Sequence, residues 1–200
     1  MLVLVGGHSR NIGKTSVVEG IIRALPEAGW TAVKVTQYGH GVCSAQGEPC
    51  DCTMDYDHPY AITEETADGP SDSGRFKAAG ARHAYWVRTP VGGLGNAIPS
   101  LREILGRAPN AIVESNSLLQ FLIPDLYLAV VDGTVEDWKE SARRYVDRVD
   151  GFVIVNRSSP TLARFRNKPM FVAAPPEYVT SELVEFVSER LSAGRRERAL

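Results

Sequence analysis

The sequence lacks a long apolar run, an excess of charge of one sign and a widely spaced set of cysteines. Its apolar runs have the length of a strand, whereas a membrane-spanning helix needs roughly 20 residues. The N-terminus enters an apolar run at once, without the basic segment and cleavage site of a secretory signal. A formal net charge of -2 gives no general attraction to nucleic acid or to a membrane surface. These absences predict a cytoplasmic globular chain that binds neither nucleic acid nor membranes.

Short apolar runs alternate with segments of helical period along the chain, which is the pattern of β-α-β units. The expected strands are residues 2–6, 31–36, 84–88, 110–114, 126–131, 151–155 and 169–173. The expected helices are residues 13–25, 73–80, 97–106, 135–147 and 180–192. A chain of 200 residues is long enough to bury a core in one domain. We therefore predict an α/β fold, with a mostly parallel sheet of about seven strands and flanking helices, as a single domain over residues 1–200.

One segment, residues 37–70, shows neither helical nor strand periodicity and is longer than most loops of compact domains. Its potential metal ligands are Cys43, Cys50, Cys52, His40 and His58. Thiolate and imidazole groups suit tetrahedral Zn²⁺, with an Fe–S cluster as the alternative, and either histidine could complete the set. The competing interpretation is reduced surface thiols or a chance disulfide, and a reducing cytosol disfavours the disulfide. We therefore predict a Cys-rich insertion loop that holds zinc or another metal.

The most informative motif follows the first expected strand. Residues 7–15 read Gly-His-Ser-Arg-Asn-Ile-Gly-Lys-Thr and lead into an expected helix. Such loops turn backbone N–H groups onto phosphate oxygens, and the helix adds its positive end. In this motif the lysine reaches the outer phosphates and the threonine hydroxyl ligates Mg²⁺. The predicted nucleotide-binding residues here are Gly7, Asn11, Ile12, Gly13, Lys14, Thr15 and Ser16. The motif predicts ATP or GTP together with Mg²⁺ as ligands.

The spacing of this phosphate loop departs from the common motif. Five residues separate Gly7 from Gly13 where four are usual, so His8 takes the place of the first glycine. The longer loop resembles that of dethiobiotin synthetase and its relatives. The related filament-forming and septum-site ATPases carry a signature lysine at the position of Ser9. Because this chain has serine there, the sequence argues against the dimeric ATPase mechanism of those families.

Polar residues near the carboxyl ends of the expected strands complete the predicted site, because these ends border the ligand crevice of an open parallel sheet. Lys34 is a candidate phosphate contact. Glu114 ends an apolar strand and is a candidate Mg²⁺ ligand together with Thr15. We predict Lys14, Glu114 and Asp72 as the catalytic residues.

Two polar positions have competing interpretations, and a third is a candidate contact for the base. Asp72 is either a metal or substrate ligand or, with Ser71, the cap of the helix that follows. Asp132 ends another apolar strand, and it either ligates the metal or makes a turn with Gly133. Asn156 ends a further strand, and its side-chain amide can donate to and accept from the edge of a purine base. We predict that Asn156 contacts the base.

Several of these segments together resemble the molybdopterin-guanine dinucleotide biosynthesis protein B family. The matching segments, in order over residues 1–135, are Val33-Lys34-Val35-Thr36 with His40, Asp72-Ser73 with Arg75, Ala79-Gly80-Ala81, and Ile112-Val113-Glu114. Ser71 and Ser115 depart from the family pattern, which has a lysine and a glycine there. The resemblance implies a P-loop NTPase with weak GTP hydrolysis and an accessory role in molybdenum-cofactor maturation. It also implies a partner protein of cofactor biosynthesis, and it is compatible with a homodimer.

Two other functions stay open on the sequence. An ATP-dependent kinase or ligase acting on a small acid, as in dethiobiotin synthetase, would use Arg75, Lys77 and Arg82 as substrate anchors. A metal-handling adaptor would let the nucleotide gate the loop of residues 43–52. Turnover without added substrate would favour the GTPase, and dependence on a carboxylated small molecule would favour the ligase. Metal affinity that changes with nucleotide state would favour the adaptor.

Overall fold

A computed structural model of the chain describes residues 1–39, 58–66, 69, 71–156 and 160–197, and the statements below concern these residues. The strands are β1 (Leu2–Gly7), β2 (Trp30–Tyr38), β3 (Ala61–Glu64), β4 (His83–Pro90), β5 (Asn110–Glu114), β6 (Leu126–Asp132), β7 (Gly151–Val155) and β8 (Met170–Ala173). The α-helices are α1 (Lys14–Ala24), α2 (Asp72–Ala78), α3 (Leu94–Arg107), α4 (Glu140–Tyr145) and α5 (Ser181–Glu197). Short 3-10 helices are η1 (Pro26–Ala28), η2 (Ser117–Gln120), η3 (Val146–Arg148) and η4 (Pro160–Phe165).

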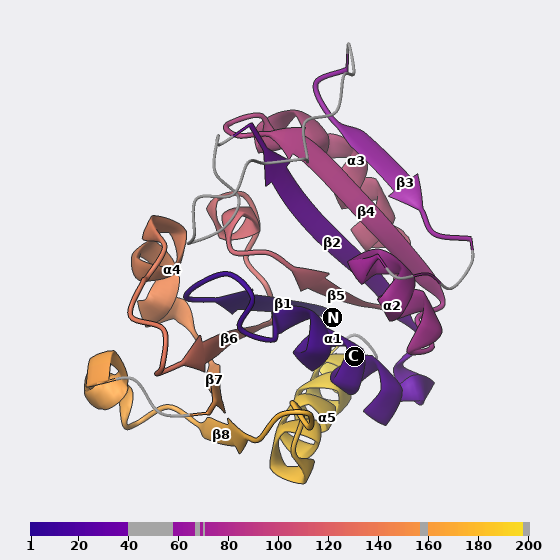
Figure 1. The fold of residues 1–200 in the computed structure, drawn as a ribbon. Helices are drawn as coiled ribbons and strands as arrows, with labels where there is room; N and C mark the ends of the chain where they lie inside the picture. Colours follow the sequence, from indigo (N-terminus) through magenta and orange to yellow (C-terminus); the bar gives the residue numbers. More distant parts are fainter. Residues whose placement is uncertain (40–57, 67–68, 70, 157–159, 198–200) are drawn as a thin grey trace.

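The strands form one twisted sheet in the order β3-β4-β2-β5-β1-β6-β7-β8 (Figure 1). All neighbours are parallel except β3, which runs antiparallel to β4 at one edge. Strand β1 lies between β5 and β6, so strands β2 to β5 form the sheet on one side of it and strands β6 to β8 form the other side. Such a branch point is where open α/β sheets bind ligands, at the carboxyl ends of the strands.

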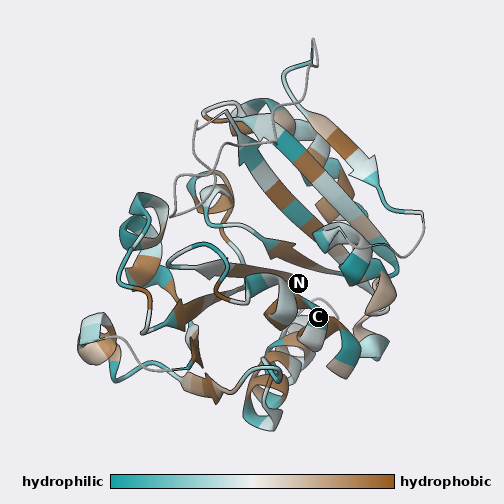
Figure 2. Cartoon of the chain, in the orientation of Figure 1, coloured by the Kyte–Doolittle hydropathy of each residue, from teal (hydrophilic) through white to brown (hydrophobic). Residues whose placement is uncertain are grey.

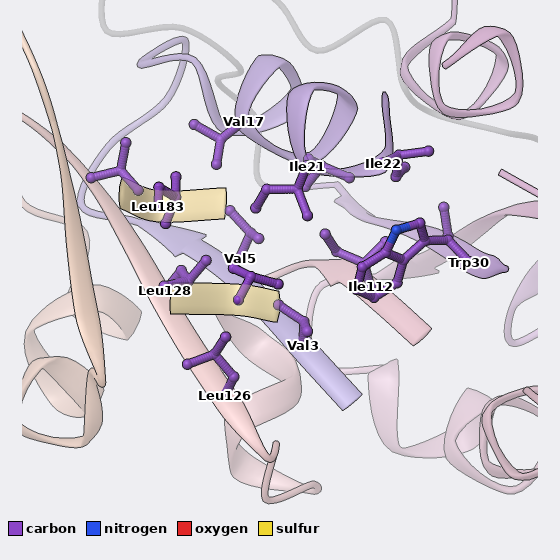
Figure 3. Packing of buried hydrophobic residues seen from close by; sticks show 14 of the residues in the cluster. Val3, Val5, Val17, Ile21, Ile22, Trp30, Ile112, Leu126, Leu128 and Leu183 are labelled. Atoms are coloured by element: carbon purple, nitrogen blue, oxygen red, sulfur yellow. The ribbon is translucent and has the colours of Figure 1, made fainter. Parts of the chain in front are cut away.

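Both faces of the sheet are covered by helices. Successive side chains of a strand point to opposite faces, so Val3 and Val5 of β1 pack against α1 and α5, whereas Leu4 packs against α3. Figure 3 shows the first of these layers, where Val3 and Val5 lie near Ile21 of α1 and Leu183 of α5. Strands buried on both faces are apolar along their length, and β1, β5, β6 and β7 follow this rule (Figure 2). The sheet is therefore a rigid support for the polar residues at its carboxyl edge.

The helix starts nearest to this edge have local causes. Helix α1 begins directly after Gly13, which has the left-handed φ of 89° that favours glycine. Helix α2 begins after Ser71, whose hydroxyl accepts the backbone N–H of Gly74 at 3.0 Å and so caps the helix. No helix in the described part of the chain has the length and hydrophobicity needed to cross a bilayer.

The predicted α/β fold is confirmed, and each of the seven predicted strands is present. Strand β3 is an addition, because it lies within residues 37–70, where the sequence pattern predicts no strand. It has only four residues, and it forms by pairing with β4, with Ala61 opposite Arg88 and Glu64 opposite Tyr85. Its sequence, Ala-Ile-Thr-Glu, contains no apolar run of strand length, whereas the equally short β8 is apolar throughout and is among the predicted strands.

The predicted helix over residues 135–147 is wrong in its first part, because α4 starts only at Glu140. The preceding residues are held instead by His8. The His8 Nε2 atom lies 3.0 Å from the Val135 carbonyl, and the Lys139 backbone N–H donates to the His8 carbonyl at 2.8 Å. The other predicted helices are present, with α3 starting earlier and α5 ending later than expected.

Candidate functional site

A cavity of about 750 Å³ opens at the carboxyl edge of the sheet, and the phosphate loop forms one of its walls. The predicted residues that line it are Asn11, Ile12, Gly13, Lys14, Thr15, Ser16, Lys34, Asp72 and Glu114. Asn11 and Gly13 have positive φ angles of 52° and 89°. Backbone of alternating handedness directs successive N–H groups to one side and makes an anion-binding concavity. The loop and the first turn of α1 therefore form the kind of surface that binds phosphate.

Gly7, the remaining predicted residue of this loop, is fixed by Asn116. The backbone N–H of Gly7 donates to Asn116 Oδ1 at 2.9 Å, and Asn116 Nδ2 donates to the Gly7 carbonyl at 2.7 Å. This pair of bonds joins the start of the phosphate loop to the segment just after β5. Sequence reasoning missed Asn116, because only the fold brings it beside a residue more than one hundred positions away.

The next wall of the cavity brings together four predicted residues. The Thr15 hydroxyl donates to Glu114 Oε2 at 2.8 Å, and Lys34 Nζ lies 2.6 Å from Glu114 Oε1 and 3.4 Å from Thr15 Oγ1. Lys34 Nζ also pairs with Asp72 Oδ2 at 2.6 Å. Lys34 and Glu114 meet because they stand opposite each other in the parallel register of β2 and β5. We call Thr15, Lys34, Asp72 and Glu114 the carboxylate corner.

Burial and charge set the ionisation of the two lysines beside this corner. Burial alone would lower the pKa of Lys34, but the carboxylates of Glu114 and Asp72 outweigh it and raise that pKa. For Lys14, burial lowers the pKa more than the Glu114 charge raises it. The Lys14 ammonium donates to the Ser9 carbonyl at 2.7 Å. Carboxylate and hydroxyl oxygens of this corner are the donor types that Mg²⁺ prefers.

The competing roles of Asp72 are separated by the structure. Ser71 supplies the cap of α2, and Asp72 turns its carboxylate to Lys34. Arg75, one turn further along α2, pairs with Glu19 of α1 at 2.6 Å and also lines the cavity. Asp72 is therefore a cavity residue, and its role as a metal or substrate ligand stays a prediction.

Asp132 makes a turn, and its carboxylate does not line the cavity. It accepts the backbone N–H of Thr134 at 2.9 Å and the Thr134 hydroxyl at 2.6 Å, so the turn spans Gly133. Asn156 Nδ2 donates to the other Asp132 oxygen at 2.7 Å. Burial would raise the pKa of Asp132, but these hydrogen bonds lower it. Asn156 is exposed and outside the cavity lining, and its contact with a base stays a prediction.

His8 points away from the cavity. Its ring is fully buried, packs on Trp138 with ring centroids 4.9 Å apart, and has Nε2 at 3.0 Å from the Val135 carbonyl. Burial lowers the pKa of His8, so the ring is neutral near pH 7. The residue that replaces the usual glycine thus anchors the loop to the segment after β6.

Two further cavity residues were missed from the sequence. Lys139 follows β6, and its backbone N–H bond to the His8 carbonyl brings it to the cavity. Tyr178 follows β8, and its ring lies against Gly13 so closely that a Cβ there would collide with it. Neither residue belongs to a motif, and only the periodic context of the neighbouring strands could have suggested these loops.

The predicted zinc site falls mostly outside the part of the chain that the structure describes. Cys43, Cys50, Cys52 and His40 are not among the described residues, whereas His58 is described and exposed. Among described residues no group of three or more His, Cys, Asp or Glu side chains is placed to hold a metal ion. The zinc site therefore stays a prediction.

No protein-family model matches the chain, and no curated protein matches it. The solved structures that resemble it include HypB and LpxK. HypB from Helicobacter pylori, solved in complex with nickel, has 12% identity and a TM-score of 0.47 over 98% of this chain and 87% of its own. LpxK from Aquifex aeolicus, solved in complex with ATP, has 15% identity and a TM-score of 0.51 over 86% of this chain. The chain spans 53% of the length of LpxK, and the likeness to LpxK shows the fold alone, a mostly parallel sheet with flanking helices.

Proposed function

We propose that this chain binds the phosphates of a purine nucleoside triphosphate, ATP or GTP, together with Mg²⁺, in the cavity beside the phosphate loop. The observation that carries the proposal is the contact of the Thr15 hydroxyl with Glu114, next to Lys14 and Lys34. A hydroxyl from the start of α1 and a buried carboxylate from β5 converge beside backbone N–H groups that suit phosphate. The LpxK structure with ATP is consistent with nucleotide binding in this fold.

The donor set of the carboxylate corner fits Mg²⁺. Thr15 and Glu114 would hold the metal, with Asp72 close by, and Mg²⁺ sites usually take one or two carboxylates with the remaining positions filled by phosphate and water. When bound, the metal would neutralise charge on the outer phosphates. Lys34 is held by the same two carboxylates, so its ammonium adds positive charge at this corner.

The reaction that this arrangement supports best is transfer of the terminal phosphoryl group to water. Lys14 and the loop N–H groups would stabilise the negative charge that develops as the bond to the leaving diphosphate breaks. We propose weak GTP hydrolysis and an accessory role in molybdenum-cofactor maturation. Support comes from the meeting of Lys34, Asp72 and Glu114, which belong to separate segments of the resemblance to the protein B family.

A phosphoryl-transfer enzyme acting on a small acid is the second candidate, and the size and polar lining of the cavity favour it. Besides the carboxylate corner, the lining includes Thr36, Gln37, Arg75 and Ser117. A cavity of about 750 Å³ has the size of a typical small-molecule site. Nucleotide turnover measured with and without carboxylated small molecules separates this candidate from a GTPase.

The metal-handling adaptor depends on Cys43, Cys50 and Cys52, which lie outside the described residues. Elemental analysis of the chain purified under reducing conditions tests the metal site. Bound transition metal whose affinity changes with nucleotide would support the adaptor, and metal-free protein would remove the zinc site from the proposal.

The test of nucleotide binding is calorimetric titration of Lys14→Ala with ATP and GTP in excess Mg²⁺. Removing the ammonium should weaken binding by about 100-fold, because a charge-assisted contact to phosphate is lost. Arg107→Ala is the matched control, since it removes one positive charge from an exposed position at the end of α3. If Lys14→Ala binds both nucleotides as tightly as the parent chain, the phosphate-loop assignment is wrong.

A further inference from the structure

Lys139 reaches the cavity from the side of β1 opposite to the carboxylate corner. Lys34 comes from β2, which lies beyond β5 on one side of β1, and Lys139 comes from the segment after β6 on the other side. Both side chains line the same cavity as Lys14. The nucleotide phosphates would therefore meet lysines from both sides of the phosphate loop.

The backbone around Lys139 is tied to the phosphate loop at His8. The Lys139 N–H donates to the His8 carbonyl at 2.8 Å, and the His8 N–H donates to the Val130 carbonyl of β6 at 3.2 Å. The His8 ring adds its contact with the Val135 carbonyl and its packing on Trp138. These contacts hold the segment before α4 against the loop, so the position of Lys139 is built into the fold.

The positive charges of the cavity are unequally balanced. Lys34 pairs with Asp72 and Glu114, and Arg75 pairs with Glu19. Within the described parts of the chain, neither Lys14 nor Lys139 forms an ion pair with a carboxylate. Two ammonium groups that share a partly buried cavity repel each other, and an anion between them removes this cost.

We propose that Lys139 binds the terminal phosphate of the nucleoside triphosphate together with Lys14, and that this contact makes the chain prefer triphosphate over diphosphate. The inference rests on the proposed nucleotide site. The lysine of a phosphate loop reaches the outer phosphates, and Lys139 lines the same cavity as Lys14, held there by its backbone bond to His8. Lys139 therefore faces the same bound phosphates as Lys14, from the side of the phosphate loop opposite to the carboxylate corner.

The contact of Lys139 with the terminal phosphate can be detected by the uptake of a proton. Burial, followed by the charges of Lys14 and Arg10, lowers the pKa of Lys139 to about 7. The charged groups facing it are Arg10 and Lys14 from the loop, Lys34 from β2 and Glu114 from β5. A phosphate beside the ammonium favours the charged form. Binding of triphosphate near pH 7.5 should therefore be accompanied by proton uptake at Lys139.

The experiment compares the parent chain with Lys139→Met, Lys139→Arg and the matched control Arg107→Met. Each chain is titrated calorimetrically at pH 7.5 with the tri- and diphosphate of adenosine and of guanosine in excess Mg²⁺. Two buffers of different ionisation enthalpy report the protons taken up. We expect Lys139→Met to weaken triphosphate binding by about 10-fold to 100-fold and diphosphate binding by less than about threefold. Lys139→Arg should restore the affinity but lose roughly half a proton or more of uptake, because arginine is always charged.

Three results would contradict the proposal. Triphosphate affinity unchanged in Lys139→Met would show that Lys139 makes no contact with the ligand. Equal weakening of tri- and diphosphate binding would show that it does not act at the terminal phosphate. Proton uptake unchanged in Lys139→Arg would assign the titrating group elsewhere. Diphosphate binding retained by Lys139→Met shows that the variant is folded. If the parent chain binds no nucleotide, it is the proposed function that fails.

Discussion

Glu114 and Asp132 occupy equivalent positions on the two sides of β1, but their carboxylates make different contacts. Each ends an apolar strand directly beside β1, Glu114 on β5 and Asp132 on β6, and both are buried. The Glu114 carboxylate contacts the Thr15 hydroxyl and the Lys34 ammonium and lines the cavity. The Asp132 carboxylate is used by Thr134 and Asn156 and lies outside the cavity lining.

The difference comes from the polar residue at the end of the next strand on each side. Beyond β5 lies β2, which places Lys34 opposite Glu114, whereas beyond β6 lies β7, whose end carries Asn156. The Lys34 ammonium pairs with the Glu114 carboxylate and leaves it charged and directed at the cavity. The oxygens of Asp132 instead accept hydrogen bonds from Thr134 and Asn156, which hold the local turn. A carboxylate at a strand end is therefore a candidate ligand only when its partners leave it directed at the cavity.

The largest effect is expected from replacing Glu114, and the matching replacement of Asp132 is its control. Glu114→Gln removes the charge beside Thr15, and we expect Mg²⁺-dependent nucleotide affinity to fall by about 100-fold. Asp132→Asn removes a charge of the same kind on the other side of β1 and should change that affinity by less than about threefold. Titrations with and without Mg²⁺ measure both variants. Equal losses in the two variants would abolish the distinction drawn between these strand ends.

A smaller effect is expected at the link between β5 and the phosphate loop. Asn116→Ala removes both hydrogen bonds to Gly7. The buried backbone groups of Gly7 then lose their partner, which should cost about 2 kcal/mol in the free energy of unfolding and weaken nucleotide binding by about tenfold. Urea denaturation and calorimetry measure the two quantities. Asn96→Ala, at an exposed position of α3, is the control, and an equal response there would show that Asn116 does not fix the loop.

The two sides of β1 also differ in the charged groups that surround their lysines, Lys34 and Lys139. The pKa of Lys34 is raised by its carboxylates, whereas the pKa of Lys139 is lowered to about 7 by burial and by Lys14 and Arg10. Between pH 7 and 10.5 the unfolded chain keeps a proton on Lys139 that the folded chain has lost, so stability rises with pH across that window. Below pH 7 the protonated, buried ammonium is present in the folded chain at its full cost.

Lys139→Met should therefore stabilise the chain, by about 2 kcal/mol at pH 6 after allowance for a partly exposed side chain, and by less as the pH approaches 10. Urea denaturation at pH 6, 8 and 10 measures the difference from the parent chain. A difference that is constant over this range would show that Lys139 has an ordinary pKa.

Much of the fold and part of the site could be predicted from local patterns. The seven parallel strands and the phosphate loop have strong signals, because an apolar run or a glycine spacing can be recognised within a few consecutive residues. Lys34, Asp72 and Glu114 could be selected as strand-end or motif residues. Their mutual contact could not, since it depends on β2 lying beside β5 in one register.

The residues that sequence reasoning missed owe their positions to distant backbone. Asn116 is held by its bonds to Gly7, Lys139 by its bond to His8, and the ring of Tyr178, which follows β8, lies against Gly13. The same His8 contacts explain why the segment before α4 is not helical, although its pattern favours a helix. Local propensity is a weak guide wherever a tertiary hydrogen bond replaces a helical one.

The measurement that tests the central claim most directly is calorimetric titration of the unmodified chain with ATP and with GTP, in excess Mg²⁺ and again in EDTA. The arrangement of Lys14, Thr15 and Glu114 predicts one site per chain for at least one of the nucleotides. Its affinity should be of micromolar order in Mg²⁺ and at least about tenfold weaker in EDTA. Absence of binding by both nucleotides at millimolar concentration in Mg²⁺ would contradict the account.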